Sequence, residues 1–291
     1  MTETLPRNFL GIPKRYSRYD GARFAVLPVP YDQAASYMPG ARHGPEAVIS
    51  ASDHVEWFDE ELQGEFYRCG IATMDAIEPN LDGPAVMEQA LFRAAKRVVR
   101  DGKFLFSLGG DHSISAGLVR AVMTKYRKLS VLQIDAHLDL RDSFLGSAHA
   151  HACVMRRVLE MGASVVPVGI RTAAQEEHRF LKRGPVSPIT ARDCHMEDDW
   201  VDRVLNALGD TVYVTIDIDG FDPAYAPGTG TPEPGGLDWY QVIGLLRLVA
   251  AEKNIVAADI VEVMPIPGQV VTEFLAARLA YKLMVYVQQR S

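Results

Sequence analysis

Short apolar, β-branched segments alternate along the chain with longer stretches that carry apolar residues at helical spacing. The short segments predict strands at Phe24–Val29, Phe104–Leu108, Ser130–Ile134, Val165–Gly169, Val212–Ile218 and Val256–Val263. The longer stretches predict helices at Ala85–Arg100, Ser113–Tyr126, Ala152–Met161, Ala174–Lys182, Asp199–Leu208, Leu237–Glu252 and Thr272–Gln288. Such alternation indicates a mainly parallel sheet with helices on both faces. Because no repeat or linker interrupts it, we expect residues 1–291 to form a single domain.

Ionisable residues gather where the predicted strands end. Asp135-Ala-His137-Leu-Asp139 closes one strand, and Asp217-Ile-Asp219 closes another. Alternate side chains of an extended backbone point the same way, so each cluster can converge on one point. Ligand sites of open α/β sheets form outside the carboxyl ends of strands. The two clusters therefore predict one shared crevice.

Each cluster also has a plainer interpretation, as a solvated acidic loop or a turn cap. The turn interpretation suits Asp222-Pro223 well and Asp217 badly. Five carboxylates and imidazoles in one place are costly without a cation. Oxygen-rich sites with a minority of imidazole suit manganese better than zinc or copper. The pattern thus favours a two-metal centre that activates water.

Three other segments carry candidate chemistry. Gly109-Gly-Asp-His112 joins a strand to a helix, either as a plain capped loop or as a turn that presents His112. Glu262 is a lone carboxylate in an apolar strand, so it either pairs with an arginine or meets a cationic substrate. His149 and His151 share a loop in which histidines serve as metal ligands, as a proton shuttle or as surface residues.

Composition narrows the class of protein. The formal net charge of -7 makes nucleic acid a poor candidate partner. Three cysteines without a pairing pattern favour a reducing cytoplasm. The segment Met1–Tyr19 has no apolar core of signal-peptide length, and no run approaches the roughly 20 apolar residues of a membrane span. We expect a cytoplasmic protein without a membrane segment.

Seven segments together resemble the ureohydrolase superfamily, which contains arginase, agmatinase and their relatives. They span most of the chain in order: Ser36-Tyr-Met-Pro-Gly-Ala-Arg42-His-Gly-Pro45, Leu108-Gly-Gly-Asp-His112, Asp135-Ala-His-Leu-Asp139, His151-Ala-Cys-Val-Met-Arg-Arg, Asp217-Ile-Asp-Gly-Phe-Asp222-Pro, Pro227-Gly-Thr-Gly-Thr-Pro232 and Val261-Glu262-Val263. The resemblance implies a three-layer α/β/α sandwich, two Mn²⁺ ions per subunit, and homo-oligomers that are trimers or hexamers.

The resemblance also implies roles for individual residues. One ion would be held by His112, Asp135, Asp139 and Asp217, and the other by Asp135, His137, Asp217 and Asp219, so that Asp135 and Asp217 bridge. Glu262 would receive the substrate guanidinium, and His151 would pass a proton to the leaving amine. A water activated between the ions would attack the guanidinium carbon, releasing urea and an amine.

The loop after Asp139 bears on the substrate that the resemblance implies. It lacks the asparagine with which arginases hold an amino-acid head group, and it carries Asp142, which favours a cationic tail. The expected substrate is therefore agmatine, a small cationic guanidino compound that would yield putrescine. N1-aminopropylagmatine, which would yield spermidine, and other guanidino compounds are alternatives. A non-catalytic metal-binding relative is a further alternative of a different class.

Overall fold

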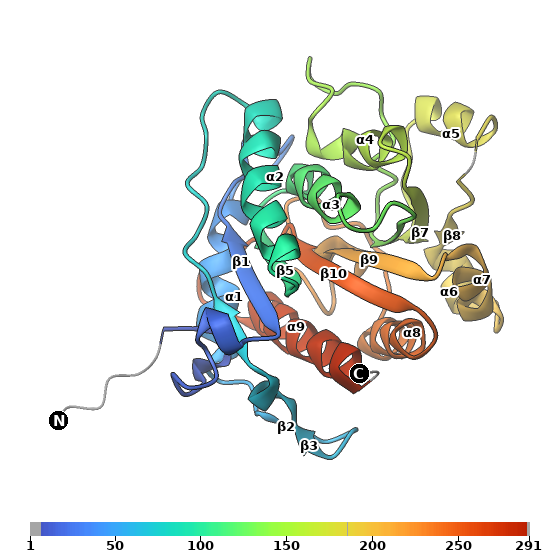
Figure 1. The fold of residues 1–291 in the computed structure, drawn as a ribbon. Coiled ribbons are helices and arrows are strands. Elements are labelled where there is room, and N and C mark those ends of the chain that lie inside the picture. The colour runs from blue at the N-terminus through green and yellow to red at the C-terminus, as the bar shows by residue number, and fades with distance from the viewer. Residues whose placement is uncertain (1–6, 185, 290–291) are drawn as a thin grey trace.

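A central sheet of eight parallel strands organises the computed structural model, which describes residues 7–184 and 186–289 (Figure 1). The strands lie in the order β4-β1-β5-β10-β9-β6-β7-β8. Their bounds are Phe24–Val29 for β1, Ile71–Thr73 for β4, Phe104–Gly109 for β5, Ser130–Ile134 for β6, Ser164–Ile170 for β7, Ile189–Thr190 for β8, Thr211–Asp217 for β9 and Asn254–Val261 for β10. Residues 1–6, part of the predicted N-terminal segment, lie outside the described residues.

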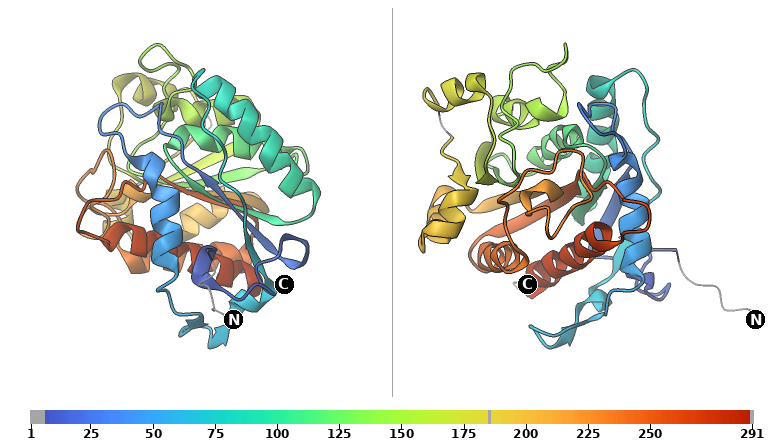
Figure 2. Two further views of the ribbon diagram at one scale, coloured as in Figure 1. Left: turned by 90° about the vertical axis from the view of Figure 1, so that its left-hand side faces the viewer. Right: turned by 180° about the vertical axis from the view of Figure 1, so that it is seen from behind.

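Helices cover both faces of the sheet, as the views in Figures 1 and 2 show. One face carries α2 (Pro84–Arg100), α3 (Ser115–Met123), α4 (Val154–Glu160) and α5 (Gln175–Leu181). The other carries α1 (Gly44–Ser52), α6 (Ala191–Met196), α7 (Trp200–Ala207), α8 (Trp239–Glu252) and α9 (Val271–Gln289). This three-layer arrangement confirms the predicted fold class. No helix in the described part of the chain has the length and apolar character that a membrane crossing needs.

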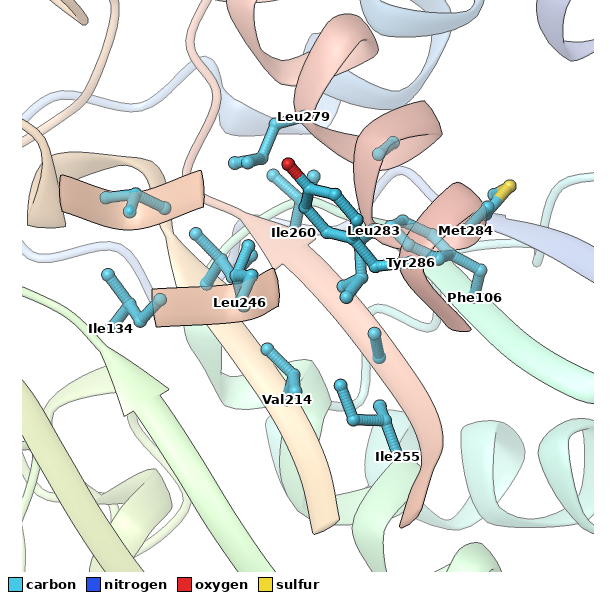
Figure 3. Close-up of a cluster of buried hydrophobic side chains, with 14 of the residues drawn as sticks. Phe106, Ile134, Val214, Leu246, Ile255, Ile260, Leu279, Leu283, Met284 and Tyr286 are labelled. Carbon is cyan, nitrogen blue, oxygen red and sulfur yellow. The ribbon is translucent and has the colours of Figure 1, made fainter. Parts of the chain in front are cut away.

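Alternation along the strands divides the buried side chains between two cores. Phe104 and Phe106 of β5 pack on the side of α8 and α9, whereas Leu105 between them packs on the side of α2 and α3. Figure 3 shows the first core, where Val214 and Ile260 of the sheet meet side chains of the two long helices. Strands buried on both faces read as continuous apolar runs, which is why the sequence pattern revealed them.

All six predicted strands and seven predicted helices are present, with ends that shift by a few residues. The prediction missed the short strands β4 and β8 and the helices α1 and α6. It also missed the antiparallel hairpin of β2 (Phe58–Asp59) and β3 (Gly64–Glu65). Elements of two to three residues are too short to show a period, so composition alone does not reveal them. The prediction that Glu262 lies inside a strand was wrong, because β10 ends at Val261.

A buried lysine fastens the hairpin segment to α9. The side chain of Lys282 is 2% exposed, and its Nζ lies 2.8 Å from Asp59 Oδ2, 3.2 Å from Glu60 Oε1 and 3.1 Å from Glu61 Oε2. Tyr286, one turn further along α9, donates to Glu61 Oε2 at 2.6 Å. Because the Asp59 carboxylate is fully buried, its charge depends on this ammonium group for compensation.

We predict that Lys282→Met lowers the free energy of unfolding by about 3–5 kcal/mol, the usual cost of leaving one member of a buried ion pair uncompensated. Urea unfolding monitored by circular dichroism measures the change. Lys128→Ala, a change at an exposed lysine, is the matched control and should shift the free energy by less than about 0.5 kcal/mol. Equal stability of Lys282→Met and the wild type would contradict the assigned role.

Candidate metal centre

The central strands β5, β10, β9 and β6 are neighbours in the sheet, and each is followed by candidate site residues at its carboxyl end. His112 follows β5, and Glu262 follows β10. Asp217 is the last residue of β9, and Asp219 follows that strand. Asp135, His137 and Asp139 follow β6. The aligned register, in which Val261 lies opposite Asp217 and Ile134 opposite Ile216, brings these ends to one edge.

The turn after β5 presents His112 because of Gly110 and Asp111. A Cβ atom on Gly110 would come within 1.8 Å of the Tyr31 carbonyl oxygen, so only glycine allows this close approach. Asp111 caps the helical turn that follows by accepting the Ser113 N–H at 3.0 Å. Both alternatives for this segment therefore hold, since Asp111 is a cap and His112 points into the crevice.

Three carboxylates converge on one nitrogen of His112. Its Nδ1 lies 3.0 Å from Asp139 Oδ2, 3.2 Å from Asp135 Oδ2 and 3.4 Å from Asp217 Oδ2. The other nitrogen, Nε2, lies 2.9 Å from Thr215 Oγ1. Because the Thr215 hydroxyl gives its own proton to a buried carboxylate, it accepts from Nε2–H, and Nδ1 is left with a lone pair among the three carboxylates.

The carboxylate behind Thr215 belongs to Asp259, which is fully buried in β10. Asp259 accepts hydrogen bonds from Thr215 at 2.6 Å, Ser115 at 2.8 Å and Tyr213 at 2.5 Å. Three donors satisfy its charge without a cation and fix the Thr215 hydroxyl. This polar network lies behind His112 and sets the ring orientation. Sequence reasoning missed it, because Ser, Thr and Tyr in buried strands look like ordinary β-sheet residues.

A second group forms around His137. Its Nδ1 lies 3.0 Å from Asp219 Oδ2 and 3.6 Å from Asp135 Oδ1. The Asp219 carboxylate also accepts the Ala136 N–H at 3.1 Å and lies 3.2 Å from Thr231 Oγ1. Asp135 thus faces both histidines, and the two groups share it.

The electrostatics of the cluster fit divalent cations. Burial and the neighbouring charges of Asp219 and Asp135 raise the pKa of Asp217 well above its usual range. Burial together with the Asp135 charge raises the pKa of Asp139 to about 7. Such shifts mean that the ionised carboxylates repel one another, and a cation between them removes that cost. The donor set of carboxylates and imidazole nitrogens suits Mn²⁺ or a similar ion.

The two clusters begin where the strands end. β6 ends at Ile134, and His137 beyond it forms an isolated parallel bridge with Thr172. β9 ends at Asp217 and the helical turn Ile218–Gly220 follows, so the extended backbone expected for the second cluster was wrong for Asp219. Asp139 has a φ of 54° and Glu262 a φ of 62°, both in the left-handed region that costs non-glycine residues about 1–3 kcal/mol. Strain of this kind is concentrated at functional sites, and here it directs two candidate carboxylates into the crevice.

Glu262 and His151 lie beside the cluster. Glu262 Oε1 accepts the His112 N–H at 2.8 Å and lies 3.6 Å from His151 Nδ1. No arginine of the described residues pairs with Glu262. Within that part of the chain, the interpretation of Glu262 as one half of a structural ion pair with an arginine was therefore wrong. Burial, and then the charges of His112 and His137, lower the pKa of His151 to about 4.

His149, whose role the sequence left open, contacts α2 and not the cluster of candidate metal ligands. Its Nδ1 lies 2.8 Å from Glu88 Oε2, and Glu88 also lies 3.7 Å from Arg120 on α3. His149 therefore joins the loop Leu140–Ala150 to α2. Of the interpretations left open for the histidine pair, that of a surface residue describes His149, which is partly exposed against Glu88, whereas His151 lies beside the crevice.

A cavity of about 280 Å³ opens over the cluster. Its lining residues come from the loops after β1, β6, β7 and β9, from the helical turn His151–Cys153 and from α5: Ser36, His137, Asp139, Arg141, Phe144, His151, Ala152, Thr172, Ala173, Ala174, Glu177 and Thr231. Asp142, which was expected to attract a cationic tail, is not among them, because it turns outward and lies 3.1 Å from Arg157. That expectation was wrong. Glu177 provides a carboxylate in the wall instead, though it already accepts the N–H groups of Leu140 and Ala174.

Fold and site together define an α/β protein with a candidate metal centre, and comparison with known proteins specifies the family. The model of the Arginase family matches residues 22–286, and the chain belongs to this family. An N(1)-aminopropylagmatine ureohydrolase from Synechocystis is 40% identical over 97% of this chain and 96% of its own length. An agmatinase from Pyrococcus horikoshii is 37% identical over 83% of this chain and 84% of its own length.

Solved structures agree with this assignment. The agmatine ureohydrolase of Thermoplasma volcanium superposes with a TM-score of 0.87 at 30% identity, covering 98% of this chain and 95% of that one. The proclavaminate amidino hydrolase of Streptomyces clavuligerus gives a TM-score of 0.90 at 27% identity, with 99% of each chain covered. The chain is an agmatinase-like ureohydrolase, which confirms the predicted family and enzyme class. The family consists of binuclear metal enzymes.

We predict that Asp217→Ala abolishes binding of both ions, because the family resemblance implies that Asp217 is a ligand of both, whereas His112→Ala weakens mainly one. Metal content of the purified variants, measured after dialysis against Mn²⁺, decides this. Asp142→Ala, a change to an exposed carboxylate outside the cavity, is the matched control. Two Mn²⁺ ions per chain and normal activity in Asp217→Ala would show that the centre is misassigned.

We further predict that His151→Asn lowers kcat by about 10²–10⁴-fold, the range for a positioned acid or base, while metal content stays unchanged. His149→Asn should have a much smaller effect, since it only loosens the contact with Glu88. Steady-state kinetics of both variants provide the test. The reverse ranking would mean that His149 is the proton-transfer residue.

Proposed function

We propose that this protein binds two Mn²⁺ ions and hydrolyses the guanidinium group of agmatine or of its N1-aminopropyl derivative, releasing urea and a polyamine. The observation that carries this proposal is the Glu262 carboxylate, which pairs with no arginine or lysine of the described residues and lies beside a cluster of candidate metal ligands. A guanidinium group is the cation that a carboxylate receives best, through paired N–H bonds. It would therefore place its carbon next to the metal ions.

The proposed ligands are those that the family resemblance implies, and the two groups around the histidines support most of them. His112, Asp135, Asp139 and Asp217 would hold one ion, and His137, Asp219 and the shared Asp135 and Asp217 the other. When bound, the ions supply Lewis acidity that lowers the pKa of a water nucleophile. Side chains beside the cavity would orient the substrate and transfer the proton.

Glu262 would orient the substrate. One of its oxygens, Oε1, is held by the His112 N–H. The other, Oε2, accepts no hydrogen bond from the described residues and is free to receive the guanidinium. Burial, and then the charge of Asp111, raise the pKa of Glu262 well above its usual range. A cationic guanidinium stabilises the ionised form, so binding of substrate and ionisation of Glu262 would reinforce each other.

His151 would deliver the proton that the leaving amine requires. Its low pKa keeps the ring neutral at pH 7, and a neutral imidazole both donates and accepts a proton. The nitrogen Nδ1 lies toward Glu262 and hence toward the guanidinium, while Nε2 lies toward the cavity mouth. Proton transfer through the ring would therefore run from the solvent side to the leaving nitrogen.

The cavity wall supports an amine tail rather than an amino-acid head group. The loop after Asp139 has no asparagine, and Ala173 and Ala174 supply no side-chain donor or acceptor. Arg141 is the cation of this wall, and it lies 3.3 Å from Glu176. The relative that is 40% identical over nearly the whole chain bears the name of the aminopropyl derivative, which favours the longer substrate.

We also infer a cytoplasmic homo-oligomer, a trimer or hexamer. All three cysteines are free thiols, which fits a reducing compartment. The oligomeric state rests on the family alone, and light scattering coupled to size-exclusion chromatography measures it.

We predict rapid urea release from agmatine or N1-aminopropylagmatine and at least a hundredfold lower kcat/KM for arginine, whose carboxylate would be desolvated near Glu177. The assay compares these compounds with guanidinobutyrate at equal concentrations in the presence of Mn²⁺. Arginine as the best substrate would overturn the proposal. Guanidinobutyrate as the best substrate would identify Arg141 as a carboxylate anchor, and Arg141→Gln would then remove that preference.

A further inference from the structure

The segment from Asp32 to Gly40 contributes Ser36 to the lining of the cavity and is held by two buried carboxylates. Asp32 accepts the N–H of Gly40 at 2.9 Å, and its Oδ1 lies 2.6 Å from Arg42 Nε. Asp111 accepts the N–H of Ala34 at 2.8 Å. Both carboxylates are at most 4% exposed, so these anchors are protected from water. The backbone on either side of Ser36 is thus fixed although its side chain is exposed.

Asp111 connects this segment to the catalytic cluster. One of its oxygens holds Ala34, and the other caps the turn that begins at His112. The position of Ser36 is consequently set relative to the same turn that supplies a candidate metal ligand. A segment placed in this way can position a second group over the cluster.

That group is His151. The Ser36 Oγ atom lies 2.9 Å from His151 Nε2, across the cavity mouth. Elsewhere the ring faces Phe144, with a centroid distance of 6.2 Å, and Glu262 at 3.6 Å. Among the described residues, Ser36 is thus the recorded hydrogen-bond partner of the imidazole, and it bears on which way the ring is turned.

We propose that Ser36 is a positioning residue for proton transfer by His151, an inference that rests on the proposed function. A hydroxyl that donates to Nε2 leaves the ring proton on Nδ1, where it faces the Glu262 carboxylate. With the guanidinium bound and Glu262 ionised, the opposite assignment would set the Nδ1 lone pair against that carboxylate, which is repulsive. Ser36 thus directs the N–H of His151 toward the guanidinium, and its exposed hydroxyl connects Nε2 to bulk water.

Kinetics of a double-mutant cycle test this role. Ser36→Ala should lower kcat about five- to tenfold, the rate equivalent of one neutral hydrogen bond, with KM and Mn²⁺ content unchanged. Ser36→Thr keeps the hydroxyl and should restore most of kcat. In the His151→Asn background, Ser36→Ala should have no further effect, because the two residues act as one unit. Ser50→Ala, at an exposed serine of α1, is the matched control and should be neutral.

Two results would overturn the proposal. One is an unchanged kcat in Ser36→Ala, and the other is an equal loss of kcat with and without His151, which would indicate a structural effect of the segment. Crystal structures of the wild type and Ser36→Ala supply a readout that needs no turnover. We expect one ring orientation of His151 in the first and a turned or divided ring in the second. An unmoved ring would refute the inference even if the true substrate differs from those proposed, whereas absence of urea release from every guanidino compound would refute only the proposed function.

Discussion

Repulsion among buried carboxylates is the interaction around which this molecule is arranged. Asp135, Asp139, Asp217 and Asp219 lie within a few ångströms of one another with almost no exposure to water. In the absence of a cation, the imidazoles of His112 and other neighbours must offset these charges, which is why the carboxyl pKa values diverge from their usual range. A rigid sheet is required to hold groups together that repel each other, and the four central parallel strands provide it.

This arrangement strains the backbone after the strands. Asp139 and Glu262 both adopt a left-handed backbone, and Gly110 allows an approach that no other residue permits. Secondary hydrogen bonds then maintain the side-chain directions. Asp259 acts through Thr215 on His112, and the His112 N–H in turn holds Glu262. One continuous network therefore orients the candidate metal ligand His112 and Glu262, the carboxylate proposed to receive the substrate.

Much of the fold could be predicted from the sequence because a parallel sheet buries its strands on both faces. The apolar runs at Phe104–Leu108 and Ser130–Ile134 leave little ambiguity, and residues that interrupt such a run at its carboxyl end stand out. The candidate ligands were identified in this way, although the extended backbone expected for the second cluster was wrong at Asp219, which lies in a helical turn. The two clusters meet because adjacent strands end at the same edge of the sheet.

What could not be predicted depends on contacts between loops that are distant in sequence. Nothing near Asp142 reveals that Arg157 draws it away from the cavity, or that Glu88 receives His149. Likewise, Ser36 is separated from His151 by more than a hundred residues, and only the folded chain brings the two together.

This difference between strands and loops has a chemical consequence. The reaction requires charges that are placed by the sheet, so the strand ends leave little freedom to vary. Substrate choice requires only that the loops over the cavity present the right wall to the tail, and here that wall consists of Arg141, Phe144, Ala174 and Glu177. Because Glu177 holds the loop at Leu140 and the loop at Ala174 together, a substitution elsewhere in either loop can change the proposed tail pocket without disturbing the charges beneath it. The strand ends, which sequence patterns reveal best, thus determine the reaction class. The loops over the cavity, which sequence patterns reveal least, determine the substrate.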